Sequence, residues 1–240
     1  MVKNRVATDR LHLWLMLGLT FSTGVIDAVG YLGLDRVFTG NMTGNVVLLG
    51  MAFTGGTGLP VLRPALALAF FMVGAALAGR VLRKGPEGWS GRTTGTLLTV
   101  ALGLTALAVY VALVDVQAEE VLGSITTSVL ATMMGIQAAT AKRLKVAEIT
   151  TVVVTSTITG LASDSRLAGG KSPFWARRSS AIALIMAGAV VGALTLKVDL
   201  WLGVAVSALL SAVVTLLGHL RHRRDRKAAV AGSAKETALR

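Results

Sequence analysis

The sequence predicts an all-α integral membrane protein, in which six transmembrane helices and two short broken segments form two inverted-topology repeats. Three observations lead to this fold. Hydrophobic residues make up 53% of the chain and charged residues only 15%, at a mean hydropathy of +0.69, whereas charged residues are about a quarter of a soluble domain. Several apolar runs reach the roughly 20 residues that cross a bilayer. Motifs of the first half also recur in the second half.

Six apolar runs are long enough to cross the hydrocarbon core as helices. They lie at residues 11–34, 61–82, 94–115, 121–141, 175–197 and 199–219. Two further stretches, 37–53 and 147–162, are shorter, only moderately apolar, and together rich in threonine, asparagine and glycine. Backbone without regular helix is tolerated at membrane depth only inside protein or beside a watery cavity. We therefore expect re-entrant or broken segments there, and the pattern leaves open whether they cross fully.

The basic residues set the expected orientation. The chain carries 24 lysines and arginines against 12 acidic residues, a formal net charge of +12, and the basic residues gather at the ends of apolar runs. If both short stretches return to the side they enter from, the positive-inside rule places the basic loops around Arg83 and Arg143 inside, together with both termini. We expect a bacterial inner-membrane protein with cytoplasmic termini, a single membrane domain over residues 1–228 and a disordered tail over 229–240.

The chain divides into two related halves, residues 11–115 and 121–219. Residues 63–79 align with residues 177–193, with arginine, methionine, glycine and alanine coinciding, and the two short polar stretches align at nearly the same offset. Apolar helices resemble one another by composition, but a Thr-x-Gly motif is not forced by apolarity. Each half has three crossings, an odd number, so the second half is expected to be inverted. Inverted repeats with interrupted segments are typical of secondary transporters.

The two short polar stretches are the expected solute site. The first reads TGNMTGN over residues 39–45 and precedes an apolar half-helix, with glycines that free the backbone and asparagines that cap helices. A half-helix that begins inside the membrane points N–H groups and a positive dipole end into a cavity, and the second stretch offers the same from the opposite side. Packing between helices is the alternative role. The predicted solute-binding residues are Tyr31, Thr39, Asn41, Thr43, Asn45, Gln137, Thr155, Thr157 and Thr159.

Asp27 is the predicted proton-coupling residue. It lies deep in the first span, where a carboxylate costs on the order of 3 kcal/mol on insertion scales. Burial disfavours the charged form of a carboxyl group, which favours uptake and release of a proton near neutral pH. The alternative role is structural: a hydrogen-bonded Asp27 that braces a neighbouring polar segment, with Gln137 as a candidate partner.

Composition argues against several other function classes. The absence of cysteine excludes disulfides, thiol catalysis and cysteine-ligated metal sites. The three histidines, His12, His219 and His222, lie at the ends of spans, and no second acidic residue accompanies Asp27. We expect no enzyme activity, no metal site and no cofactor. The basic tail after the last span is typical of a segment drawn to anionic lipid headgroups, so we expect the lipid bilayer as a partner and no nucleic acid.

Three motifs carry a resemblance to a known family. They are DAVGYL at 27–32, FTGNMTGN at 38–45 and MGIQA at 134–138. Over nearly its whole length the chain resembles the YoaK-like bacterial membrane proteins, a domain of unknown function. The resemblance implies a six-helix inner-membrane protein with no settled activity. The family usually has a Gln-Asn pair where this chain has Gln137-Ala138. At the level of fold, the chain is also distantly similar to the core repeat of sulfate-permease and uracil-permease transporters.

The sequence therefore predicts a small secondary transporter that forms a homodimer. It would move a small solute, with an anion favoured, through a mid-membrane site between two half-helices, with proton coupling at Asp27. Two alternatives remain open: a channel for a small ion or neutral solute, and a sensor or assembly factor that does not transport. Small residues at four-residue spacing are expected to pack the two repeats or two protomers together. These are Gly74, Ala78, Gly188 and Gly192.

Overall fold

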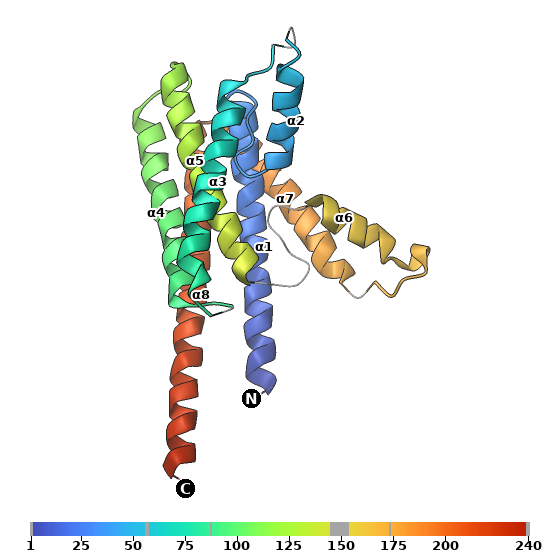
Figure 1. The fold of residues 1–240 in the computed structure, drawn as a ribbon, viewed down its shortest axis with the longest axis vertical. Coiled ribbons are helices and arrows are strands. Elements are labelled where there is room, and N and C mark those ends of the chain that lie inside the picture. Colours follow the sequence, from blue (N-terminus) through green and yellow to red (C-terminus); the bar gives the residue numbers. More distant parts are fainter. Residues whose placement is uncertain (1, 56–57, 87, 145–153, 173, 239–240) are drawn as a thin grey trace.

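The computed structural model of the protein describes residues 2–55, 58–86, 88–144, 154–172 and 174–238. The regular elements in these residues are all helical (Figure 1). In chain order they are α1 (Val2–Gly33), α2 (Met42–Ala52), α3 (Leu62–Arg83), α4 (Gly91–Leu113), α5 (Glu120–Leu144), α6 (Val154–Ser163), the 3-10 turn η1 (Arg166–Ala168), α7 (Trp175–Thr195) and α8 (Leu200–Ala238).

Six of these helices are long and apolar enough to cross a membrane. They are α1, α3, α4, α5, α7 and α8, which coincide with the six predicted runs, so the all-α membrane fold is confirmed. One difference lies at the C-terminus, where α8 continues as a helix through Ala238 and includes most of the segment predicted as a disordered tail. Residues 229–238 of this helix include four alanines, and alanine is the strongest helix former.

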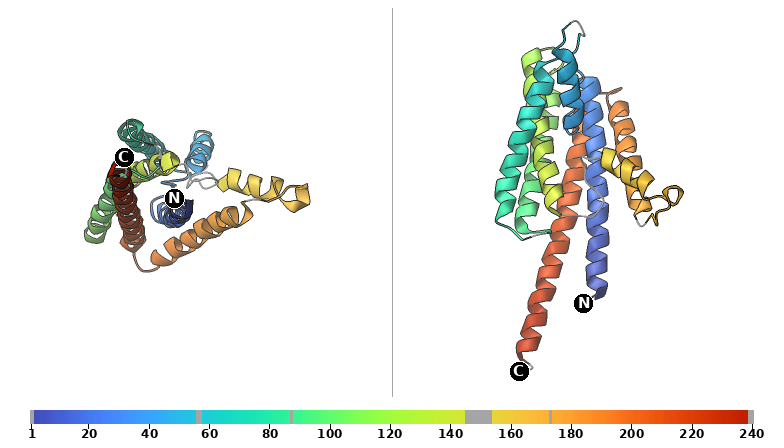
Figure 2. Two further views of the ribbon diagram at one scale, coloured as in Figure 1. Left: turned by 90° about the horizontal axis from the view of Figure 1, so that it is seen from below. Right: turned by 45° about the vertical axis from the view of Figure 1, so that its right-hand side comes forward.

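The two short helices, α2 and α6, have 11 and 10 residues. At about 1.5 Å per residue, either helix reaches only about half of the 30 Å hydrocarbon core. In Figure 1, α2 begins at mid-length of the bundle and ends beside the start of α3, at the end of the bundle where α1 also ends. Both views of Figure 2 show α6 projecting sideways from the bundle. Residues 147–153 of the second predicted stretch lie outside the described residues.

The helices of the two halves pack across each other. α1 packs against α7 and α8, α5 packs against α3 and α4, and α4 lies along α8. In the first half, α3 therefore packs against α5 of the second half. In the second half, α7 packs against α1 of the first half. In the most apolar window of α1, 78% of residues are buried, against 22% in α3 and in α7. The first helix of each half, α1 or α5, thus packs against the two long helices that follow in the other half's equivalent positions. The inverted orientation of the two halves stays a prediction.

Glycines let the paired helices approach closely. A Cβ atom added at Gly24 or Gly188 would lie 2.2 or 2.1 Å from a backbone carbonyl oxygen across the α1–α7 contact. A Cβ atom at Gly74 or Gly135 would lie 2.2 Å from a carbonyl oxygen across the α3–α5 contact. The structure thus puts Gly74 and Gly188 at the contacts between the two halves, as their spacing predicts.

Candidate functional site

Asp27 on α1 holds the turn at residues 39–41, which leads into α2. Its side chain is half-buried on α1, and its Oδ1 atom accepts the backbone N–H groups of Gly40 at 2.7 Å, Thr39 at 3.1 Å and Asn41 at 3.3 Å. Successive N–H groups that converge on one point form an anion-binding concavity. The carboxylate of Asp27 is the anion that this concavity holds, so the bracing role is the one that the geometry displays.

The chain reverses direction after α1 to reach this position. Asp35 and Arg36 have φ angles of 62° and 56°, in the left-handed region that non-glycine residues seldom adopt. The segment 37–41 then returns along α1. A Cβ atom at Gly30 would lie 2.6 Å from a backbone carbonyl oxygen of this segment, so glycine is required there. The reversal brings three consecutive N–H groups to the level of Asp27.

Asparagine and tyrosine side chains hold the same turn. Asn41 caps α2 by accepting the N–H of Gly44 at 3.2 Å. Asn45 is fully buried, and its amide accepts the N–H of Phe38 at 2.9 Å and donates to the carbonyl of Phe38 at 2.5 Å. Tyr31 stacks on Phe38 with 4.8 Å between the ring centroids. These three predicted solute-binding residues therefore support the turn through their own contacts.

Gln137 approaches the turn from α5. It is fully buried, and its Nε2 donates to Oγ1 of Thr23 at 3.3 Å. A Cβ atom at Gly40 would lie 3.0 Å from Cγ2 of Thr23 and 3.3 Å from Oδ1 of Asp27, so these side chains enclose Gly40. Two buried polar atoms beside the turn, Thr39 Oγ1 and Gln137 Oε1, have no hydrogen-bond partner within the described residues. Gln137 thus approaches Asp27 through Thr23 and Gly40.

The other predicted solute-binding residues lie apart from this cluster. Thr43 is exposed on α2. On α6, Thr155 and Thr159 are exposed, Thr157 is buried, and Oγ1 of Thr159 donates to the carbonyl of Thr155 at 2.9 Å. Among the described elements, α6 packs against α7 and η1, away from Asp27. The solute-binding role of the three α6 threonines stays a prediction.

Two features of the structure were not singled out from the sequence. Thr23 lies one helical turn before Asp27, and this spacing on one helix face could have revealed it. The second feature is Arg178 on α7, which donates to the carbonyl of Gly160 and forms a 2.6 Å ion pair with Asp164. The hydrogen bond from Arg178 holds the pKa of the Asp164 carboxyl below its usual range. This pairing needs residues 14 apart to meet, which no helical period predicts.

Comparisons with known proteins place the chain in a family. A family profile described as a protein of unknown function (DUF1275) matches residues 15–217. The UPF0700 transmembrane protein YoaK of Bacillus subtilis (strain 168) is 36% identical over 150 residues, which are 61% of this chain and 64% of that relative. The matched region thus spans slightly less than two thirds of the relative. No solved structure matches the chain. The family profile covers most of the chain, so this multi-pass membrane protein belongs to the DUF1275 family.

Proposed function

We propose that this protein is a small secondary transporter for an anionic solute, with proton coupling through Asp27. The observation that carries the proposal is one carboxylate oxygen inside a membrane span that accepts three backbone N–H groups. An ionisable group at membrane depth is costly, and in membrane proteins such groups mark ion and proton pathways. The turn that Asp27 holds leads directly into α2, a half-length helix. In transporters with broken helices, such half-helices form the substrate site.

The proposed coupling follows from competition for the N–H groups of residues 39–41. When Asp27 is ionised, its carboxylate occupies these donors. When Asp27 takes up a proton, its negative charge is lost, and the same donors favour an incoming anion. Proton binding and anion binding therefore assist each other, and the assistance is reciprocal because the two equilibria are linked.

Further groups around the turn support binding of a polar solute. The N-terminus of α2 adds the positive end of its helix dipole, which favours an anion. Thr39 Oγ1 and Gln137 Oε1, the two buried atoms without a partner in the described residues, can hydrogen-bond to a solute that enters the turn. A buried polar atom left unpaired costs about 1–3 kcal/mol, so a solute that pairs with it gains affinity.

We also propose an inner-membrane location with cytoplasmic termini. Both termini lie at one end of the bundle (Figure 1), and α3 and α5 end there as well. Their last turns carry Arg80, Arg83, Lys142 and Arg143, and basic loop residues mark the cytoplasmic side. In this proposal the protein acts as a homodimer through its exposed apolar faces, requires no cofactor and catalyses no reaction.

A thermal-shift screen of the detergent-purified protein tests the proposal. The compounds are chloride, phosphate, sulfate, acetate, succinate and uracil, each at an acidic and a neutral pH. A bound ligand stabilises the folded state by RT ln(1 + [L]/Kd), so weak ligands register at high concentration. We expect one anion class to stabilise the protein more at acidic pH, because protonation of Asp27 frees the turn.

The Asp27→Asn variant separates coupling from binding. Its neutral amide imitates the protonated carboxyl, so the anion should bind this variant equally at both pH values, while the exposed-site control Asp115→Asn keeps the wild-type pH dependence. Unchanged pH dependence in Asp27→Asn, or no stabilising anion, would contradict the proposal. In proteoliposomes, unlabelled anion inside should accelerate uptake of labelled anion, whereas a channel shows no such counterflow.

A further inference from the structure

The hairpin formed by α6, η1 and the start of α7 leaves the bundle and exposes an apolar groove. The hairpin projects from the other helices in both views of Figure 2. A groove of about 460 Å³ runs between α6 and α7 and is lined by Leu161, Ser179, Ile182, Ala183, Met186, Ala187 and Val190. Met186 and Val190 are 62% and 54% exposed, so no other described helix covers the groove.

A basic pocket lies at the start of the same helix. This second hollow, about 500 Å³, is lined by Arg166, Leu167, Lys171, Ser172 and Trp175. Trp175 lines the basic pocket, and Ser179, four residues later, lines the apolar groove. Residues four apart lie on one face of a helix. The basic pocket and the apolar groove therefore follow each other along one face of α7.

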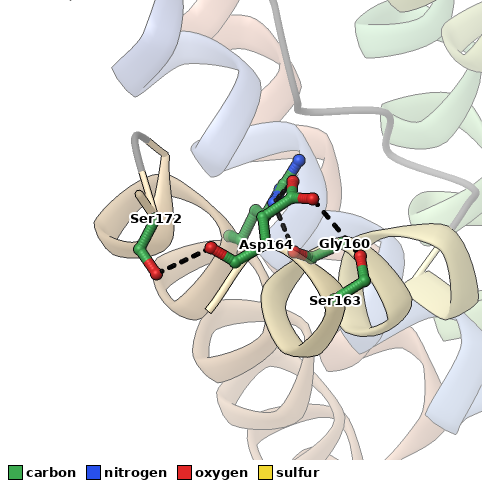
Figure 3. A network of polar contacts seen from close by, with 5 residues as sticks. Gly160, Ser163, Asp164 and Ser172 are labelled. Carbon is green, nitrogen blue, oxygen red and sulfur yellow. Dashed lines mark hydrogen bonds and ion pairs between the residues drawn. The ribbon is translucent and has the colours of Figure 1, made fainter. Parts of the chain in front are cut away.

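The positive charge of this pocket is not cancelled by the neighbouring acid. Asp164 is engaged by Arg178, which also binds the carbonyl of Gly160 and so closes α6 onto α7. Figure 3 shows Asp164 among its partners, with Ser163 and Ser172 bonded to it from either side. Arg166 and Lys171 are exposed and line the pocket as surplus positive charge.

The dimensions of the groove match one leaflet of a bilayer. From Ser179 to Val190, at about 1.5 Å per residue, α7 covers about 16 Å, close to half of a hydrocarbon core about 30 Å thick. Of the residues that line the basic pocket, Leu167 is fully exposed and Trp175 is 61% exposed. Tryptophan and basic residues together are typical of the level of the lipid headgroups.

We propose that this face of α7 binds an anionic phospholipid. The phosphate group lies between Arg166 and Lys171 at the headgroup level, and one acyl chain lies in the groove from Ser179 to Val190. The basic charge selects anionic over zwitterionic headgroups, and the groove distinguishes a lipid from a free phosphate compound. The site is independent of Asp27 and of transport.

Native mass spectrometry of the intact purified protein tests the site. The probes are dioleoylphosphatidylglycerol, dioleoylphosphatidylcholine and the soluble compound glycerol 3-phosphate. We expect one phosphatidylglycerol to remain bound, and neither phosphatidylcholine nor glycerol 3-phosphate. Each basic residue near an anionic lipid contributes about fivefold in affinity. The double variant Arg166→Gln, Lys171→Gln should therefore bind phosphatidylglycerol about 25-fold more weakly.

Two controls make the test specific. The double variant Lys84→Gln, Arg92→Gln removes the same charge from exposed residues between α3 and the start of α4 and should retain the lipid as the wild type does. Ala187→Phe fills the groove without a change of charge and should also release the lipid, whereas Ala76→Phe, at an exposed position on α3, should not. Equal retention of the two lipids, equal effects of the two charge variants, or a change of oligomer size without lipid loss in Ala187→Phe would overturn the proposal.

Discussion

Replacement of Asp27 by alanine removes the oxygen that accepts the N–H groups of Thr39, Gly40 and Asn41. The N–H of Asn41 belongs to an exposed residue, so water can replace the carboxylate there, whereas Thr39 and Gly40 are buried. Two buried donors are therefore left without an acceptor. Each costs about 1–3 kcal/mol, which predicts that Asp27→Ala lowers the free energy of unfolding by about 2–6 kcal/mol.

The conservative variant Asp27→Asn should have a smaller effect. Its amide oxygen keeps an acceptor in place but carries no charge. Hydrogen bonds to charged groups contribute about 1.5–3 kcal/mol and those between neutral groups about 0.5–1.5 kcal/mol. The difference is about 1–1.5 kcal/mol per bond, so the expected loss is about 2–3 kcal/mol for two buried bonds. It is reduced because a neutral amide costs less to bury than a carboxylate.

Thermal unfolding of the purified variants in one detergent measures this order. Asp115→Ala is the matched control, because Asp115 also accepts two backbone N–H groups, from Gln117 and Ala118, but at an exposed turn. Water can replace that carboxylate, so the control should lower the melting temperature much less than Asp27→Ala. If Asp27→Ala and Asp115→Ala have equal effects, the assignment of Asp27 as the group that holds the α2 turn is refuted.

Three further predictions address helix packing, the hairpin and the turn. Gly188→Ala places a Cβ atom 2.1 Å from a carbonyl oxygen of α1 and should cost about 1–3 kcal/mol through overpacking, while Gly79→Ala, with no atom within 4 Å, should be neutral or stabilising in the same thermal assay. The hydrogen bond from Arg178 lowers the folded-state pKa of Asp164. The stability from this pair is therefore present above the unfolded-state pKa, about 3.9, and is lost as pH falls through the lower folded-state pKa. The difference in melting temperature between wild type and Asp164→Asn should vanish in that pH window. Asn45→Ala removes two hydrogen bonds to the turn and should lower the unfolding free energy by about 2–4 kcal/mol, as chemical denaturation would show.

The spans were predictable because the bilayer fixes their length and polarity. All six runs of the sequence correspond to helices, since roughly 20 apolar residues have few alternatives to a spanning helix. The pairing of helices was not predictable to the same degree. The spacing of Gly74 and Gly188 predicted close helix contacts. A glycine does not indicate which backbone faces it, and here that backbone belongs to the other half of the chain.

The candidate site was predictable as a group of residues and not as a set of bonds. The cost of a carboxylate at membrane depth singled out Asp27, and the capping pattern singled out residues 39–45. Gln137 was the partner suggested for Asp27, whereas the structure gives Asp27 three backbone N–H groups. Every residue except proline has a backbone N–H donor, so the sequence does not indicate which donors converge on Asp27. The reversal of the chain at Asp35 and Arg36 determines this, and no sequence pattern predicts that reversal.

The inverted arrangement of the two halves is the central claim about the fold, because it requires that α2 and α6 enter the membrane from opposite sides. Cysteine labelling measures it in the natural cysteine-free background. Thr54 follows α2 and Ser163 ends α6, and both are exposed. In right-side-out and inverted vesicles, an impermeant maleimide should label Thr54→Cys from the outside and Ser163→Cys from the cytoplasmic side. Labelling of both variants from the same side would contradict the inverted arrangement.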